Sequence, residues 1–312
     1  MDRSRGGDAL ANPNAAPESR LLVNRIGVWT SYLVELSPED MACAFAAKGW
    51  RHLELSDEHA RALLERGDPS SAGRRFREFA SGHGVGFPQG HLWLHVDVTA
   101  DNHNETIDAL RRWLDLFLAL EIRAAVIHPG GNDLKKAGVD PEIIMARRVR
   151  AFRALTAHVR GTPLRLCLEN TPAANSVDEL LAILEAVGGP HLAICLDTGH
   201  LHMADGDQPD FIRRAGALLQ ALHIADNEGQ SDQHLMPYGR GTIRWPPLIS
   251  ALKEIGYDGL FNLEIPGENR CPMPVRLAKL DYIKTMVGMM LDGLDDSVSP
   301  KGRPPIAKES DR

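Results

Sequence analysis

Short apolar runs alternate with longer amphipathic segments along most of the chain. The first apolar runs, at 21–30, 52–56 and 84–94, predict three strands, and five further runs follow in the second half. The segments between them have helical periodicity, and several open on a capping residue followed by Pro or acids, as at Ser37 and Asp140. Strands that alternate with helices lie parallel and are joined by right-handed crossovers.

Eight such units in about 270 residues fit a closed barrel better than an open sheet. We therefore predict an α/β fold with a single (β/α)8 TIM barrel over residues 20–292. An open Rossmann-type sheet would need a Gly-rich turn after the first strand, where this chain has Trp29-Thr30-Ser31-Tyr32. Residues 1–19 and 293–312 are rich in Pro, Gly, Ser, Asp and Arg without periodicity, which predicts disordered tails.

The five apolar runs of the second half each end in a residue able to bind a metal. These residues are His128, Glu169, Asp197, His223 and Glu264. Buried strands do not carry carboxylates at their ends without a partner. Five strands that end this way predict one shared polar site at the carboxyl edge of a parallel sheet, which is where TIM barrels have their active sites.

The alternation of side chains along a strand predicts what lies beneath this site. The residues that share a face with the last four ligand candidates are Cys167, Cys195, Ala221 and Asn262. These side chains are small, as the crowded interior of a barrel demands. The residues predicted to point outward, under the helices, are Leu166, Leu168, Ile194, Leu196, Leu222 and Leu263.

Composition and charge narrow the range of functions. The 312-residue chain is 43% hydrophobic and 25% charged, as expected of a globular protein with a substantial core. A formal net charge of −7 provides no general attraction for nucleic acid or acidic membranes. The four cysteines are scattered without a C-x-x-C pair, which favours reduced thiols. The first 20 residues lack the apolar segment of a secretory signal, so we expect a cytoplasmic protein with no membrane contact. The negative net charge disfavours nucleic acid as a partner.

Three carboxylates and an imidazole directed at one point indicate a metal centre. Glu169, Asp197 and Glu264 would repel one another unless a cation neutralised them. An oxygen-rich set completed by His223 suits one divalent ion, with Mn²⁺ as first choice and Mg²⁺, Co²⁺ and Zn²⁺ as alternatives. The competing interpretation is that each acid forms a separate ion pair at the surface. Because the four candidates end consecutive strands, we favour one shared metal over four separate ion pairs.

A second layer of polar residues is expected at the same end of the barrel. His200 follows Asp197 in D-T-G-H, and Asp232 and His234 form a D-x-H pair in a long Gly-rich loop, 226–242, that we interpret as a flexible lid. His91 and His128 end the third and fourth strands. The candidate substrate-binding residues are therefore His91, His128, His200, Asp232 and His234. The competing interpretation is that the loop residues among them are ordinary solvent-exposed side chains, which would give the same sequence pattern.

The same motifs carry a family resemblance. The runs C-L-E-N, C-L-D-T-G-H, H-I-A-D-N-E-G, D-Q-H-L-M-P-Y-G-R-G-T-I and N-L-E-I-P-G-E resemble the xylose isomerase-like TIM barrel superfamily over about residues 21–290. This superfamily includes sugar-phosphate isomerase/epimerase-type proteins and the endonuclease IV class of abasic-site nucleases. The resemblance is specific for fold and metal site, and unspecific for substrate.

Resemblance to the ketose 3-epimerases implies that Glu169, Asp197, His223 and Glu264 hold the metal. It further implies that His200 contacts substrate and that Glu169 and Glu264 exchange its proton. The chain departs from this pattern at two positions. Asn175 stands where the epimerases have a second Glu, and Gly229 stands where they have a substrate-binding Arg.

Resemblance to endonuclease IV implies a different metal content. Nine residues appear in the order of that family's ligands for a three-zinc cluster: His91, His128, Glu169, Asp197, His200, His223, Asp232, His234 and Glu264. The D-x-H and G-x-G-x-I runs also occur in the sugar enzymes, and the loops show no cluster of basic residues that would bind DNA.

These observations lead us to expect a divalent-metal-dependent isomerase or epimerase acting on a sugar, polyol or keto-sugar. Glu169 or Glu264 would abstract a proton next to a metal-polarised carbonyl, giving an enediolate. The first alternative is a lyase with the same chemistry, either a dehydratase or a keto-glycoside deglycosidase. The abasic-site nuclease ranks third. A homo-oligomer or an obligate second subunit stays open.

Overall fold

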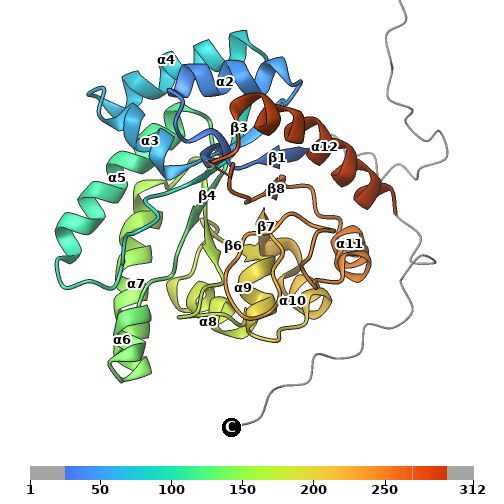
Figure 1. The fold of residues 1–312 in the computed structure, drawn as a ribbon. Coiled ribbons are helices and arrows are strands. Elements are labelled where there is room, and N and C mark those ends of the chain that lie inside the picture. The colour runs from blue at the N-terminus through green and yellow to red at the C-terminus, as the bar shows by residue number, and fades with distance from the viewer. Residues whose placement is uncertain (1–24, 269, 294–312) are drawn as a thin grey trace, which may run out of the picture.

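The computed structural model describes residues 25–268 and 270–293, and its centre is a ring of eight short parallel strands (Figure 1). The strands are β1 (Ile26–Val28), β2 (His52–Leu55), β3 (Gly86–His91), β4 (Ala124–Ile127), β5 (Arg165–Glu169), β6 (Leu192–Asp197), β7 (Leu219–His223) and β8 (Phe261–Leu263). Strands β2 to β7 pair in sequence order, and β1 pairs with β8.

Two single bridges close the ring between these groups. Trp29, just after β1, bridges to Glu54 of β2, and Ile224, just after β7, bridges to Leu263 of β8. The second contact is reinforced by the backbone N–H of Ile224, which donates to the carbonyl of Asn262 at 2.8 Å. All pairings are parallel, so the predicted (β/α)8 barrel is confirmed.

The helices cover the outside of the ring. They are α2 (Pro38–Ala47), α3 (Asp57–Leu64), α4 (Pro69–Gly82), α5 (His103–Ala119), α6 (Asn132–Lys136), α7 (Pro141–His158), α8 (Val177–Val187), α9 (Thr198–Met203), α10 (Gln208–Ala215), α11 (Trp245–Glu254) and α12 (Met273–Asp292), with the 3-10 turns η1 (Thr30–Leu33) and η2 (Gly216–Leu218). The caps follow the predicted chemistry. Ser37 accepts the N–H of Asp40, and Ser176 forms a capping box with Glu179.

Some element boundaries differ from the prediction. The helical segment predicted between the strands at 52–56 and 84–94 is two helices, α3 and α4, because Asp68-Pro69 starts a new helix with its own cap. The short helices α6 and α9 in the loops after β4 and β6 were not predicted. Strand β3 ends at His91 rather than at position 94. The predicted tails, 1–19 and 293–312, lie outside the described residues except for Gly293, which follows α12.

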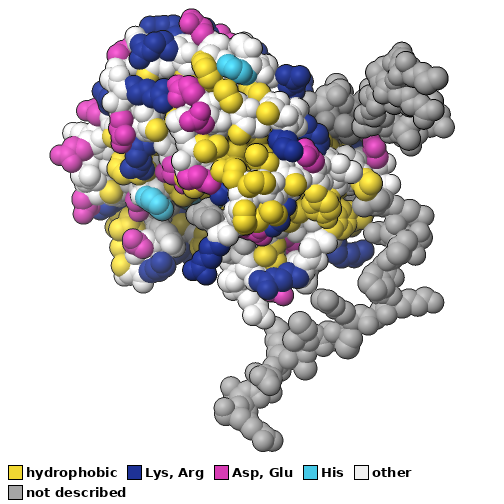
Figure 2. Space-filling view, turned by 45° about the horizontal axis from the view of Figure 1, so that its top comes forward, with side chains coloured by type: hydrophobic (Ala, Val, Ile, Leu, Met, Phe, Trp, Pro, Cys, Tyr) yellow, Lys and Arg dark blue, Asp and Glu magenta, His cyan; other side chains and the backbone are white. Residues whose placement is uncertain are grey.

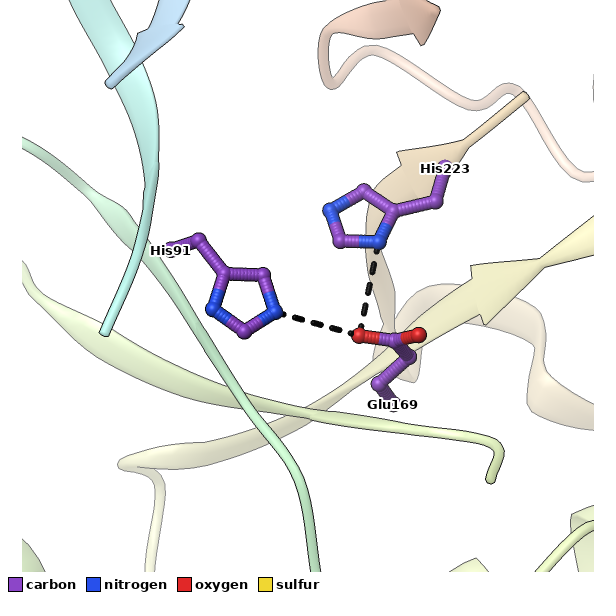
Figure 3. Close-up of side chains that lie close together, drawn as sticks. All are labelled: His91, Glu169 and His223. Carbon is purple, nitrogen blue, oxygen red and sulfur yellow. Dashed lines mark ion pairs between the residues drawn. The ribbon is translucent and has the colours of Figure 1, made fainter. Parts of the chain in front are cut away.

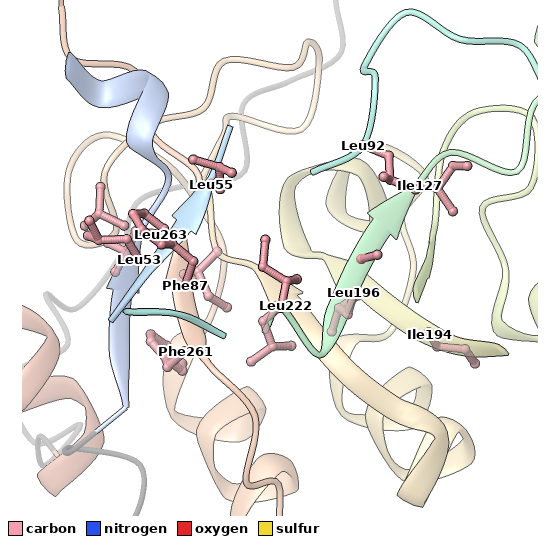
Figure 4. Packing of buried hydrophobic residues seen from close by; sticks show 14 of the residues in the cluster. Leu53, Leu55, Phe87, Leu92, Ile127, Ile194, Leu196, Leu222, Phe261 and Leu263 are labelled. Atoms are coloured by element: carbon pink, nitrogen blue, oxygen red, sulfur yellow. The ribbon is translucent and has the colours of Figure 1, made fainter. Parts of the chain in front are cut away.

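The core has two separate layers, as the strand alternation predicts. Inside the ring lies a cluster of small side chains: Ala124, Val126, Cys167, Ala193, Cys195 and Ala221. Larger side chains point outward and pack under the helices, among them Leu53, Phe87, Ile194, Leu222 and Phe261 (Figure 4). Fully burying one such side chain contributes roughly 1.5–3 kcal/mol. The narrow interior brings the carboxyl ends of the strands close together.

The surface combines charged groups with exposed apolar side chains. Figure 2 shows hydrophobic side chains gathered on one face among Lys, Arg, Asp and Glu. Three of the exposed large hydrophobic residues, Val275, Tyr282 and Met289, lie on α12. Within the described ranges, no helix has the length and the apolar run needed to cross a membrane.

Candidate metal centre

Four ligand candidates converge at the carboxyl end of the barrel. Glu169 ends β5, Asp197 ends β6, His223 ends β7, and Glu264 follows β8. One ligand atom from each lies within 4.8 Å of all the others. Asp197 and His223 are neighbours in the strand register. All four side chains are buried, so the predicted cluster is present.

The atoms that face one another in this cluster lack hydrogen-bond partners. They are Glu169 Oε2, Asp197 Oδ2, His223 Nδ1 and Glu264 Oε2. Buried polar atoms are nearly always satisfied, and leaving one unsatisfied costs about 1–3 kcal/mol. Four such atoms around one point fit a bound cation, which accepts lone pairs from carboxylate oxygen and imidazole nitrogen alike. Three carboxylates and one imidazole suit a divalent ion.

His91 joins the same centre from β3. Its Nδ1 lies 2.7 Å from the carbonyl oxygen of Leu92, and it must donate there because a carbonyl only accepts. The other nitrogen, Nε2, is buried without a hydrogen-bond partner, 3.4 Å from Glu169 Oε2. His223 Nδ1 approaches this same oxygen at 3.4 Å (Figure 3). His91, Glu169 and His223 therefore form a second group able to hold a metal.

His128, just beyond β4, extends this group toward the opening of the barrel. Its Nε2 also lies 3.4 Å from Glu169 Oε2, and its ring stands perpendicular to that of His91 with the centroids 5.2 Å apart. The side chain of His128 is 27% exposed, whereas those of His91 and Glu169 are almost inaccessible. A ligand entering from solvent would therefore meet His128 first.

The three loop residues assemble beside the quartet. His200 Nε2 and His234 Nε2 lie 3.2 and 3.1 Å from Asp232 Oδ2. The Nδ1 atoms of both histidines are fixed on backbone carbonyls, those of Asn170 and Glu264. Two imidazole nitrogens that face one carboxylate need either protons or a cation between them. Beside the four-residue cluster, the group of His200, Asp232 and His234 is therefore a second position that requires a positive charge, either as protons or as a cation.

Burial and charge set the protonation of these groups. Burial raises the pKa of Asp197 to about 7, against the opposing charge of His200. Burial lowers the pKa of His200, but Asp197 and Asp232 outweigh it and raise the pKa to about 12. Asp232 and Glu264 likewise raise the pKa of His234 to about 10, despite its burial. Protons on the histidines balance the carboxylates here, and a metal would displace them.

The long loop after β7 is anchored at its base. Asp226 and Leu235 exchange two backbone hydrogen bonds of 2.8 Å, and the carboxylate of Asp226 accepts the N–H of Ile243 at 3.1 Å. The backbone N–H of Thr242 donates to the carbonyl of Asn227 at 2.9 Å. The predicted lid, 226–242, is therefore held at both of its ends, and the contacts of Asp232 with His200 and of His234 with the carbonyl of Glu264 hold its middle against the site.

Sequence reasoning missed two residues that support the ligands. Glu54 of β2 is fully buried and accepts a hydrogen bond from His223. Asn170 accepts the N–H of Asp197 at 2.7 Å and donates to the carbonyl of the same residue at 3.0 Å. An acid inside the apolar run HLEL was a signal for Glu54 that the search for strand-terminal ligands passed over. Asn175 bonds Asn170 and the carbonyl of His200, so it braces the loops.

Known proteins with similar sequences include sugar epimerases. D-psicose 3-epimerase of Enterocloster bolteae is 31% identical over 124 residues, which cover 38% of this chain and 39% of that protein. An uncharacterized protein of Methanocaldococcus jannaschii is 27% identical over 167 residues, covering 51% of this chain and 56% of the relative. The chain thus spans about half the length, or less, of the curated relatives it matches.

Comparisons with solved structures and family models agree on the fold. A crystal structure of D-psicose 3-epimerase, obtained in the presence of D-fructose, superposes with a TM-score of 0.72 at 18% identity. The superposition covers 86% of this chain and all of the epimerase. The family model described as a xylose isomerase-like TIM barrel matches residues 44–286. The chain therefore belongs to the xylose isomerase-like TIM barrel family.

Proposed function

We propose that this protein is a divalent-metal-dependent epimerase or isomerase of sugars, polyols or keto-sugars. The observation that carries the proposal is the ring of unsatisfied ligand atoms from Glu169, Asp197, His223 and Glu264. The named relatives, D-psicose 3-epimerase and fructoselysine 3-epimerase, support the reaction class. Retained carboxylates at these positions argue against an inactive relative.

These four residues would hold the ion. A bound divalent ion acts as a Lewis acid toward a substrate carbonyl and makes the neighbouring C–H more acidic. The other requirement is a base that is ionised at neutral pH. Burial alone would raise the pKa of Glu169, but His223 and His128 hold it well below its usual value. His223 and His234 lower the pKa of Glu264 in the same way.

Two ionised carboxylates beside one substrate carbon can move a proton in both directions. Glu169 comes from β5 and Glu264 follows β8, so they approach the centre from different parts of the ring. Removal of the proton by one and its delivery by the other, through an enediolate, inverts the carbon, which is epimerisation. Return of the proton to the adjacent carbon is isomerisation. Loss of a leaving group from the next carbon would be the lyase outcome.

The surrounding polar side chains would orient the substrate. His128, His200, Asp232 and His234 are the partly exposed members of the site, and they offer both donors and acceptors to sugar hydroxyls. His91 lies deeper and is fully buried. Hydrogen bonds to the substrate hydroxyls would hold the reacting C–H between the two glutamates. Proton transfer then no longer depends on a chance encounter and proceeds as an effectively intramolecular step.

The test is proton exchange with solvent. Protein loaded with Mn²⁺, Mg²⁺, Co²⁺ or Zn²⁺ is incubated with a panel of ketoses and keto-sugars in D2O and followed by NMR. We expect deuterium at the carbon next to the carbonyl, with a new epimer or isomer. Loss of a leaving group in the same spectra would identify the lyase.

The variants Glu169→Gln and Glu264→Gln should lower the rate of exchange by at least about 100-fold. Glu254→Gln is the matched control, because Glu254 pairs with Arg213 on the outer surface. Deuterium incorporation that is equal in all three variants, or that is absent with every metal and substrate, would refute the proposal.

A nuclease-type reaction ranks third, after the lyase, and the additional histidines are the observation in its favour. His91 forms a second group able to hold an ion with Glu169 and His223, His128 also approaches Glu169, and His200 and His234 both face Asp232. Elemental analysis of protein purified without chelator distinguishes the nuclease from the epimerase. About one metal per chain supports the epimerase. About three zinc ions, with cleavage of abasic duplex DNA, would support the nuclease.

A further inference from the structure

The floor of the candidate metal centre contains a carboxylate that touches none of the carboxylate ligands. Glu54, on β2, is completely buried inside the barrel. One of its oxygens lies 2.9 Å from His223 Nε2, and the other accepts the side-chain amide of Asn262. Among the described residues, His223 is the only basic side chain within ion-pair distance of Glu54.

This contact fixes which nitrogen of His223 faces the site. One Glu54 oxygen accepts the amide of Asn262 and the other faces His223 Nε2 at 2.9 Å, so this Nε2 is the nitrogen placed to donate its proton to a carboxylate oxygen. The lone pair of a neutral His223 is then on Nδ1, which lies 3.1 Å from Glu264 Oε2 and 3.4 Å from Glu169 Oε2 without a hydrogen bond. An outward-facing Nδ1 is the form that a metal ligand requires.

We propose that Glu54 is a positioning residue that holds His223 in its ligand tautomer and strengthens it as a metal donor. The inference rests on the proposed function. A carboxylate behind a ligating imidazole increases the electron density that the imidazole offers to an ion. Glu54 itself reaches neither metal nor substrate, since its two oxygens are occupied by His223 and Asn262.

The neighbouring imidazole shows that this arrangement is particular to His223. His91 stacks on His223, with ring centroids 5.6 Å apart and planes inclined by 21°. Its outer nitrogen is held by the neutral carbonyl of Leu92. Of these two stacked imidazoles, only His223 is hydrogen-bonded to a carboxylate through its second nitrogen. His223 is therefore the stronger nitrogen ligand, and β2, β7 and β8 are joined through Glu54 beneath it.

Two substitutions separate the charge of Glu54 from its hydrogen bond. Glu54→Gln keeps an acceptor for His223 Nε2–H, and Asn262 can rotate its amide to present Oδ1, which has no partner in the wild type. Glu54→Ala removes the acceptor as well. The matched control is Asp57→Asn, which neutralises another buried carboxylate just after β2 that makes no hydrogen bond or ion pair with the four ligands.

The measurement is calorimetric titration of the metal-free proteins with Mn²⁺. We expect the Kd for Mn²⁺ to rise by about 10–100-fold in Glu54→Ala, by less in Glu54→Gln, and little in Asp57→Asn. A wild type that binds no Mn²⁺ would defeat the proposed function. A wild type that binds Mn²⁺ while Glu54→Ala binds it equally well would overturn this inference alone.

A spectroscopic readout covers the case in which Glu54→Ala does not fold. In Zn²⁺-loaded protein with ¹⁵N-labelled histidine, His223 should show a protonated Nε2 and a metal-bound Nδ1. The Nε2 proton should resonate far downfield because it is bonded to a carboxylate, and it should move upfield in Glu54→Gln. An unchanged resonance in Glu54→Gln would show that Glu54 only fills space.

Discussion

Gly267 lies in the loop after β8, three residues beyond Glu264, where it passes close to the loop after β1. A β carbon added to Gly267 would stand 1.8 Å from the carbonyl oxygen of Tyr32 and 2.8 Å from its carbonyl carbon. Real β carbons essentially never approach another heavy atom closer than 3.0 Å, so Gly267→Ala must separate the two loops by about 1.2 Å. The obstacle is backbone, which cannot rotate away as a side chain can.

The size of the effect follows from this displacement. Overpacking of this kind costs about 1–3 kcal/mol of unfolding free energy. At about 2–4 °C per kcal/mol for a chain of this size, Tm should fall by roughly 2–12 °C. The movement also reaches Glu264 along a short stretch of chain, and a shift of about 1 Å at a reacting group costs about 100-fold in rate. We therefore expect Gly267→Ala to impair metal binding and turnover more than stability.

The assay compares Gly267→Ala with a glycine that has room. Gly288 lies within α12, with no heavy atom within 4 Å of an added β carbon. Gly288→Ala should stabilise the protein by about 0.4–1 kcal/mol and leave the site unchanged. Urea denaturation and Mn²⁺ titration are measured for both variants. If Gly267→Ala matched the wild type in Tm and in Kd for Mn²⁺, the close approach of the two loops would be wrong.

Three further predictions concern the clamp on α12, the thiols and the metal. Arg276, a buried residue of α12, donates to both oxygens of Glu35 and to the carbonyl of Tyr32, so Arg276→Met should cost about 1–3 kcal/mol in urea denaturation. Since Arg276 lowers the pKa of Glu35, the stability lost in Glu35→Gln should be full above pH 5 and shrink at lower pH; a loss independent of pH would contradict this. Burial raises the pKa of Cys167 to about 12 and that of Cys195 well above its usual value, so a thiol reagent should modify at most two of the four cysteines in the folded protein. Modification of all four cysteines in a single phase, without denaturant, would contradict this prediction. Mn²⁺ at about 100 times its Kd should add about 2.7 kcal/mol to the unfolding free energy, a gain that chelator reverses, and an unchanged Tm would exclude a metal in this cluster.

The fold and the clustering of the four ligand candidates were largely accessible from the sequence, because both depend on local periodicity. Apolar runs that end in Glu169, Asp197 and His223 specify strands, and the parallel arrangement then brings their ends together. The small interior partners Cys167 and Cys195 follow from the period of two along a strand, and both lie in the interior cluster.

The support beneath the ligands was not accessible, because it depends on contacts between distant strands. Glu54 reaches His223 across 169 positions in the sequence, so the acid inside the run HLEL signals an unusual strand residue but does not identify its partner. Asn175 likewise stood out only as a departure from the epimerase pattern, whereas the structure shows it bonded to Asn170 and to the carbonyl of His200. The division of 57–82 into two helices depended on a single Asp-Pro cap.

The small side chains inside the ring determine how closely opposite strands approach, and therefore how far apart the ligand candidates lie at the carboxyl end of the barrel. Alanine at 221, directly beneath His223, and cysteine at 195, beneath Asp197, allow opposite walls to approach. Enlarging Ala221 to Val would widen the ring by a fraction of an ångström and pull the ligand atoms outward together. A larger ion would then be favoured over a smaller one with every ligand intact. If the cluster holds the proposed ion, the ionic radius that it prefers would thus depend on interior residues that do not contact the ion.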